Sequence, residues 1–371
     1  MKPKIIAMYL PQFHCIPEND EFWGKGFTDW VTVRKAKPLY KGHNQPKKPL
    51  AERYYDLSVK EDVAWHAKIA KQYGIYGFGI YHYWFNTEKN LLTKPAQIIL
   101  ENLDIDINYY FAWDNTSWIR SWSNVKEHGN AWAPAQDVMH NKKGAPTTLV
   151  KYEIGGETDW EKHFMYLLPY FRDCRYIKIG NKPMFTIFHY SSAISQMCEL
   201  WEILARKYGF DGIYFLFRYD RKSDIPKNRN KFKYEPQFSG WRNMSYFQKG
   251  YLKLVRVLLK TNYKIFDYNV IWKRILKNAQ KHSDSDIYHG AFVSYDDTPR
   301  RGEKGIVVRN ATPEAFSFFL SKLIDISLSQ NKEYIFLTAW NEWGEGAVLE
   351  PDTYYGYGFL ESMKHVLTYY K

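Results

Sequence analysis

Eight short apolar segments, spread along almost the whole chain, most restrict the fold that this sequence can adopt. Helical patterns fall between several of them, at residues 59–73, 160–171, 195–208 and 313–329. Buried strands that alternate with helices are typical of a parallel sheet covered by helices, and eight of them predict a (β/α)8 barrel of the α/β class. The predicted strands are Lys4–Leu10, Gly77–Trp84, Ile107–Trp113, Lys182–His189, Gly212–Arg218, Tyr234–Ser239, His289–Tyr295 and Tyr334–Trp340.

Three long polar segments, 14–57, 115–157 and 219–245, each follow a predicted strand. In a barrel these positions are βα loops, which surround the active site. No low-complexity linker divides the chain, so we expect residues 1–371 to form one barrel with long βα loops. Residues 246–282 indicate one or two basic amphipathic helices on the outside of the barrel; contact with a membrane surface is the alternative interpretation.

The composition is aromatic and basic. The chain has 14 Trp, 31 Tyr and 23 Phe, and its formal net charge is +12. Aromatic side chains bind the apolar faces of sugars as well as nucleic-acid bases. The charge would favour an acidic or lipid-linked glycan, a nucleic acid or an anionic membrane surface, or it is simply a solvated basic surface. No apolar stretch approaches the roughly 20 residues that span a bilayer. The short apolar run after Met1-Lys2-Pro3-Lys4 does not resemble a signal peptide, so we expect a cytoplasmic protein.

The segment Trp340-Asn341-Glu342-Trp343-Gly344-Glu345-Gly346 follows the last predicted strand. In a barrel it would place two carboxylates at the C-terminal mouth, where active sites lie. Two close carboxylates repel each other, so one pKa should rise and provide an acid near neutral pH. The alternative is that Glu342 and Glu345 only cap a helix N-terminus.

The other predicted strands also end in polar or aromatic residues, a pattern that indicates a carbohydrate cleft. Single residues such as His82 or Asp296 could equally have structural roles. We also expect Trp23, Trp30, Trp118 and Trp122, in the long loops, to form walls of this cleft. The candidate substrate-binding residues are Tyr9, His14, Tyr81, His82, Trp84, Trp113, Asp114, Asn115, Trp118, His189, Glu235, Tyr295, Asp296, Arg301, Trp340, Asn341 and Trp343.

Motifs of several other enzyme classes are absent from the sequence. It has no G-x-x-x-x-G-K-[ST] loop, no G-x-G-x-x-G after a strand, no H-E-x-x-H and no G-x-S-x-G. Asp104-Ile105-Asp106 precedes a predicted strand, so we interpret it as a turn and not as the metal-binding element of a sugar-nucleotide transferase. We therefore expect no metal, no cofactor and no nucleic-acid partner.

Motifs throughout the chain carry a family resemblance. They are Tyr9–His14, Pro17–Asp20, Trp23–Trp30, Tyr76–Phe78, His82–Phe85, Asp211–Tyr214, Asp297–Arg301, Trp340–Gly346 and Leu349–Pro351. These segments resemble the WbsX-type proteins of bacterial polysaccharide loci, which are often labelled glycosyltransferases. Those proteins in turn resemble the endo-α-mannosidases of glycoside hydrolase family 99, which are (β/α)8 barrels with a similar E-W-x-E-G segment.

The resemblance implies roles for the two glutamates. Glu342 would accept the proton of the sugar 2-hydroxyl, whose oxygen attacks the anomeric carbon to give a 1,2-anhydro sugar. Glu345 would protonate the leaving oxygen and then deprotonate water. One segment departs from the family pattern: where relatives commonly read W-A-N-E-N-W, Thr116 replaces the usual acid and Asp114 is a new one.

Three functions follow as hypotheses. The first is a retaining endo-glycosidase-like enzyme that acts on a bacterial surface polysaccharide or its precursor. The second is a glycosyltransferase of lipopolysaccharide or capsular polysaccharide biosynthesis. The third is a non-catalytic glycan-binding barrel.

Overall fold

The computed structural model describes residues 3–119, 148–220, 224–258, 261, 263–283 and 286–370. Within them, parallel strands close into a barrel in the order β1-β14-β12-β10-β9-β8-β4-β2, with β2 pairing back onto β1. This closure confirms the predicted (β/α)8 barrel. The barrel strands are β1 (Lys4–Tyr9), β2 (Gly77–Asn86), β4 (Asn108–Trp113), β8 (Lys182–Ile187), β9 (Tyr214–Arg218), β10 (Asn230–Phe232), β12 (Ile287–Phe292) and β14 (Tyr334–Thr338).

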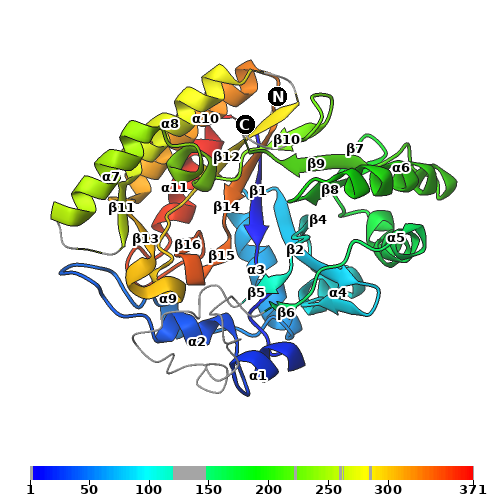
Figure 1. Ribbon diagram of the computed structural model, residues 1–371, viewed down its shortest axis with the longest axis horizontal. Helices are drawn as coiled ribbons and strands as arrows, with labels where there is room; N and C mark the ends of the chain where they lie inside the picture. Colours follow the sequence, from blue (N-terminus) through cyan, green and yellow to red (C-terminus); the bar gives the residue numbers. More distant parts are fainter. Residues whose placement is uncertain are drawn as a thin grey trace.

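Helices surround the barrel, and shorter elements cover its ends (Figure 1). The helices are α1 (Pro17–Trp23), α2 (Asp29–Arg34), α3 (Lys60–Gln72), α4 (Lys94–Glu101), α5 (Glu157–Arg172), α6 (Ser192–Lys207), α7 (Tyr246–Leu258), α8 (Tyr268–Lys281), α9 (Thr298–Arg301), α10 (Pro313–Ser329) and α11 (Gly358–Thr368), with the single turns η1 (Leu50–Glu52), η3 (Phe238–Arg242), η4 (Gly302–Lys304) and η5 (Trp343–Glu345). The shorter strands are β3 (Lys89–Leu91), β5 (Trp118–Ile119), β6 (Thr148–Val150), β7 (Lys178–Ile179), β11 (Lys264–Asp267), β13 (Ile306–Arg309), β15 (Asn341–Glu342) and β16 (Ala347–Val348).

Local sequence signals set where the outer helices begin. The side chains of Ser191, Asp267 and Thr312 each accept a hydrogen bond from the backbone N–H three residues later, at the starts of α6, α8 and α10. Such N-caps satisfy donors that the first helical turn leaves free. Each is worth about 1 kcal/mol, so these caps fix the ends of helices whose apolar faces cover the strands.

Aromatic rings fill the barrel interior. The rings of Phe232 and Phe336 lie 5.1 Å apart, and the ring of Tyr110 lies 6.2 Å from Phe336. Gly79 provides the space for Tyr110, because a Cβ at residue 79 would lie 2.8 Å from that ring. The interior is therefore packed, and a substrate can reach only the end of the barrel.

The sixth barrel strand lies earlier than predicted. The sequence favours Tyr234–Ser239, whereas the structure has Asn230–Phe232. Lys231 and Lys233 are buried beside this strand, a placement that apolar patterns do not reveal. The ammonium of Lys231 lies 3.1 Å from a carboxylate oxygen of Asp286, and that of Lys233 donates to a backbone carbonyl of α8.

The basic segment forms two helices, α7 and α8, joined through β11. β11 pairs in parallel with β13, outside the barrel sheet. α8 packs against α10, whereas α7 lies farther out (Figure 1). No helix in the described part of the chain is long and apolar enough to cross a membrane.

Candidate active site

The two candidate catalytic glutamates lie directly after β14, at the end of the barrel that α2 and α9 cover (Figure 1). The backbone before them is held tightly. Asn341 accepts a hydrogen bond from the Leu10 N–H at 2.7 Å and donates one to the Leu10 carbonyl at 2.9 Å. Because one side chain satisfies both backbone groups, the position of Glu342 is fixed relative to β1.

One arginine connects the two glutamates. Arg300 Nη1 donates to Glu345 Oε1 at 3.0 Å, and Nη2 lies 3.4 Å from Glu342 Oε2. The same Nη2 donates to Asp29 Oδ2 at 3.0 Å. Three carboxyl groups therefore surround a single guanidinium, an arrangement in which one carboxyl tends to keep its proton.

Burial raises the pKa of Glu342 to about 8; Arg300 opposes this rise, whereas Glu345 and Asp29 add to it. For Arg300, burial disfavours the charge, but its three carboxyl neighbours hold its pKa well above the usual value. Glu345 is more accessible, with 21% of its side chain exposed against 6% for Glu342. The pair thus combines a buried carboxyl that titrates near neutrality with a more exposed one.

The glycines of this segment are required by close packing. A Cβ at Gly344 would lie 2.5 Å from Arg300 Nε and 2.6 Å from Asp29 Oδ2. Gly346 has φ +58°, in the left-handed region, and its position is crowded by Asp296. The short chain between the glutamates can therefore approach the Arg300 cluster only without side chains at residues 344 and 346.

Four buried tyrosines surround the glutamates. Burial raises the pKa of Tyr81, Tyr83 and Tyr234, and the negative charge of Glu342 adds to each rise. The pKa of Tyr295 is raised by burial and then by Glu345. These hydroxyls keep their protons at neutral pH and can donate to a sugar oxygen or a carboxylate.

Asp114 belongs to the same end of the barrel, because its charge contributes to the raised pKa of Glu342. Burial raises the pKa of Asp114 itself, and the hydroxyl of Thr116 donates to its Oδ1 at 2.8 Å. The two departures from the family pattern therefore form one hydrogen-bonded pair.

Other side chains surround this end of the barrel and are partly accessible. The half-buried Trp118 packs its ring 5.3 Å from that of Tyr83. Arg218 Nη2 lies 3.1 Å from Nε2 of the exposed His189, and Trp241 packs its ring 4.9 Å from that of Tyr295.

Several predicted binding residues are instead buried in the core, next to the segment that carries the glutamates. Tyr9, Trp340 and Trp343 are fully buried. The Trp343 indole N–H donates to Glu350, which also accepts from the Tyr55 hydroxyl and lies 2.7 Å from His66. His66 in turn hydrogen-bonds the Tyr9 hydroxyl. This network fixes the backbone between Glu342 and Glu345.

Three other predicted binding residues face the helices that surround the barrel. His82 hydrogen-bonds His163 of α5, and burial lowers the pKa of His82 to about 3. Trp84 stacks on the same His163 with ring centres 4.4 Å apart, and the Trp113 indole donates to the Trp84 carbonyl. On β2, Tyr81 and Tyr83 alternate with these outward residues, as a strand requires.

Most of the remaining predicted binding residues form hydrogen bonds or ion pairs with other groups of the protein. Asn115 pairs with both backbone groups of His189, and Glu235 accepts from the Ser239 N–H and hydroxyl. Asp296 accepts from Gln45, bonds His43, and donates its N–H to the Glu345 carbonyl. His14 is buried, and its Nδ1 has no partner in the described residues. Arg301 is half exposed and pairs with Asp297.

Two of the four loop indoles are packing residues. Trp23 is buried against Phe27 in a small separate cluster. Trp30 is buried between Phe13 and Trp343 and donates to the Tyr55 carbonyl. Neither offers an open face to a sugar, contrary to the expectation that they form cleft walls. Trp122 lies outside the described residues.

Arg300 and Asp29 are site residues that sequence reasoning missed. Both stand in motifs that carry the family resemblance, which is the signal that could have found them. The sequence prediction includes Arg301, whereas Arg300 contacts the glutamates. The sequence cannot distinguish the two, because only the turn of α9 determines which arginine faces the glutamates.

Comparisons with known proteins show the family to which the chain is similar. The family model of the glycosyltransferase WbsX matches residues 5–363. Two proteins from Xanthomonas campestris pv. campestris, each named "Uncharacterized protein WxcX", are 28% and 27% identical. Each alignment covers 98% of this chain and 49% of the relative, so the chain spans about half the length of these curated relatives.

Solved structures share the fold. The GH99 endo-α-mannosidase from Bacteroides thetaiotaomicron matches with a TM-score of 0.56 and 13% identity, over 99% of this chain and 97% of that one. A glycoside hydrolase-like protein matches with a TM-score of 0.56 and 10% identity, over 99% and 94%. At such identities the likeness establishes the barrel fold.

Proposed function

The chain belongs to the WbsX glycosyltransferase family, and we propose that it is a retaining glycan-active enzyme whose catalytic residues are Glu342 and Glu345. The observation that carries this proposal is the pair of carboxyl groups on one partly buried guanidinium at the C-terminal end of the barrel. Helix capping does not require such a pair, and barrel enzymes place catalytic groups at this end.

In the proposed route, ionised Glu342 accepts the proton of a sugar 2-hydroxyl while that oxygen forms a bond to the anomeric carbon. The bond from the anomeric carbon to the leaving oxygen breaks, and Glu345 gives its proton to that oxygen. In the second step Glu345 deprotonates water, and the water oxygen forms a bond to the anomeric carbon. The bond between the 2-oxygen and that carbon breaks, and the 2-oxygen takes its proton back from Glu342. Two inversions at the same carbon give net retention.

At neutral pH the raised pKa leaves Glu342 ionised in only part of the enzyme, and the proposed route starts from that ionised part. A base is most effective when its pKa is close to the working pH, and a carboxylate with a pKa of about 8 holds a proton more strongly than an ordinary one. Arg300, which touches both glutamates, would keep them in position as their charges change between the steps.

The substrate in this proposal is an oligosaccharide or polysaccharide, with Tyr81, Tyr295, Asp114, Trp118 and His189 as binding residues. A cavity of about 530 Å³ beside the site is lined by Tyr295 and Asp296, and also by Lys41, Lys47 and Arg309. These cations support an acidic glycan. A lipid-linked precursor and action in the cytoplasm belong to the same proposal, and cell fractionation tests the location.

A glycosyltransferase is the second candidate, favoured by the description of the family. The same two glutamates would serve it, because an acceptor hydroxyl can replace water in the second step. The two reactions differ in their products, since transfer lengthens an added acceptor and hydrolysis does not. A donor that is a sugar nucleotide would also bind as the free nucleoside diphosphate, which calorimetric titration detects.

The test is a screen of α-mannosides and related oligosaccharides for release or transfer by the wild type and by Glu345→Gln. Loss of a general acid costs about 10²-fold or more in turnover, and we expect this loss with an unchanged melting temperature. Wild-type turnover by Glu345→Gln would contradict the assignment. Tight glycan binding without any turnover by the wild type would favour the non-catalytic barrel.

A further inference from the structure

Helix α7 carries an apolar surface that nothing in the described part of the chain covers. Tyr246, Phe247, Leu254, Val257 and Leu258 are between 55% and 92% exposed. At 3.6 residues per turn these positions fall within roughly one third of the helix circumference. They lie along one side of the helix, two at its start and three in its last turns, and we call them the α7 stripe; exposed apolar side chains gathered on one side mark a contact site.

Two lysines lie along one edge of this stripe. Lys249 and Lys253 lie on the helix next to its edge by the same periodicity and are exposed. Residues 236–283 contain ten Lys and Arg and a single acid, Asp267. Asp267 accepts hydrogen bonds from the Val270 N–H and from Asn310, so its carboxylate is already hydrogen-bonded to residues outside the stripe.

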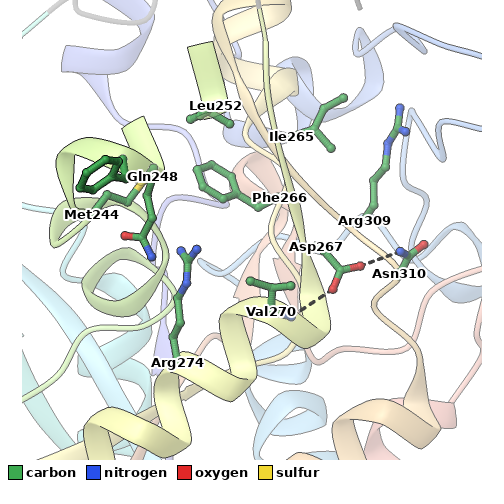
Figure 2. Close-up of a pocket in the computed structure, with 11 residues that line it drawn as sticks. Met244, Gln248, Leu252, Ile265, Phe266, Asp267, Val270, Arg274, Arg309 and Asn310 are labelled. Carbon is green, nitrogen blue, oxygen red and sulfur yellow. Dashed lines mark hydrogen bonds between the residues drawn. The ribbon is translucent and has the colours of Figure 1, made fainter. Parts of the chain in front are cut away.

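The side of α7 that faces the barrel, together with Phe247 of the stripe, lines a largely apolar cavity of about 570 Å³. Figure 2 shows Met244, Gln248 and Leu252, from α7 and the turn before it, facing Phe266 and Val270. Trp241 connects this region to the active site, because its ring contacts both Phe266 and Tyr295. A surface bound by α7 would therefore lie beside the end of the barrel that holds the glutamates.

We propose that α7 docks on an anionic lipid bilayer, with the α7 stripe inserted among the acyl chains and its lysines at the headgroups. An apolar helix face bordered by lysines is the pattern of helices that lie in a membrane interface, and anionic lipids attract such basic clusters. A second copy of this chain fits less well, since a two-fold contact through α7 would bring two basic surfaces together. This inference goes beyond the proposed function and does not depend on it.

Flotation with phosphatidylcholine vesicles, with and without 30–40% phosphatidylglycerol, tests the proposal. We expect binding that requires the anionic lipid and weakens as salt increases. Each of Lys249→Gln and Lys253→Gln should weaken partitioning about fivefold, the scale of one basic residue at an anionic surface. Phe247→Ser should weaken it about tenfold or more, from the loss of one inserted ring.

The control is Ile203→Ser on α6, where an apolar side chain that is 62% exposed lies outside the basic segment. It should bind vesicles as the wild type does. The proposal is overturned if the wild type fails to float with anionic vesicles, or if Phe247→Ser floats as well as Ile203→Ser. It is also overturned if light scattering shows a dimer that Phe247→Ser dissociates while vesicles bind neither form.

Discussion

Arg300 Nη1 donates a hydrogen bond to Glu345 Oε1 over 3.0 Å, although the two residues come from different βα loops of the barrel. Because Nη2 of the same side chain reaches Glu342, one guanidinium orients both carboxyl groups. A planar guanidinium holds the two carboxyl groups through separate nitrogens in a fixed geometry, whereas an ammonium has all its donors on one rotatable nitrogen.

Arg300→Lys keeps the charge and removes the fork, so we expect turnover to fall at least tenfold. Arg300→Met should in addition lower stability by about 3–5 kcal/mol, because it leaves buried carboxyl groups without their cation. Turnover assays and thermal melts check both results. The neighbouring Arg301→Lys, at a half-exposed pair, is the control and should change little. Equal effects at both arginines would contradict the special role of Arg300.

Gly344→Ala should damage the site through packing alone. The added Cβ would press against both Arg300 Nε and Asp29 Oδ2, so the segment must move and the glutamates lose their alignment. We expect a large fall in turnover and a destabilisation of about 1–3 kcal/mol. Gly250→Ala on α7, where a Cβ meets nothing within 4 Å, should be neutral or stabilising. An active Gly344→Ala enzyme would show that this close approach is not needed.

Glu342 should make the protein less stable as pH rises through neutrality. Its pKa is near the usual value for a carboxyl when unfolded and about 8 when folded, so between these values the folded state binds more protons. Stability is then lost as pH rises, by up to about 1.4 kcal/mol per pH unit for one proton. Buried histidines with lowered pKa, such as His82 and His163, act in the opposite direction but only below pH 7.

Melting temperatures between pH 7 and 8 therefore measure the carboxyl effect, which levels off above the folded pKa of about 8. We expect a decline in the wild type that becomes shallower in Glu342→Gln and stays unchanged in Glu303→Gln, a change at an exposed carboxylate. The same slope in wild type and Glu342→Gln would mean that Glu342 is ionised throughout this range.

The barrel could be predicted because seven of its strands are apolar enough to stand out between polar turns. The strand Asn230–Phe232 could not, since Lys231 is buried there by an ion pair with Asp286 that depends on a contact 55 residues away. Tertiary pairing of this kind overrides local pattern.

The site was predictable in part for a similar reason. A motif at a strand end predicts which segment reaches the mouth of the barrel. The segment that contains Glu342 and Glu345 does reach it, and both carboxyl groups contact the Arg300 guanidinium. It does not indicate which side of the strand each residue faces or what already binds it. His82 lies near the end of one expected strand and Asn115 just after another, yet they bond His163 and the His189 backbone.

The central claim is that the 2-hydroxyl of the sugar, and not Glu342, attacks the anomeric carbon. A direct-nucleophile retaining enzyme forms a covalent glycosyl-enzyme, whereas in our account Glu342 only accepts a proton. The measurement is mass spectrometry of the intact enzyme after exposure to a matched pair of substrates, one with the 2-hydroxyl and one with fluorine in its place. We predict turnover of the first, and neither turnover nor labelling with the second. A stable glycosyl adduct on Glu342 would contradict the account and make that residue the nucleophile.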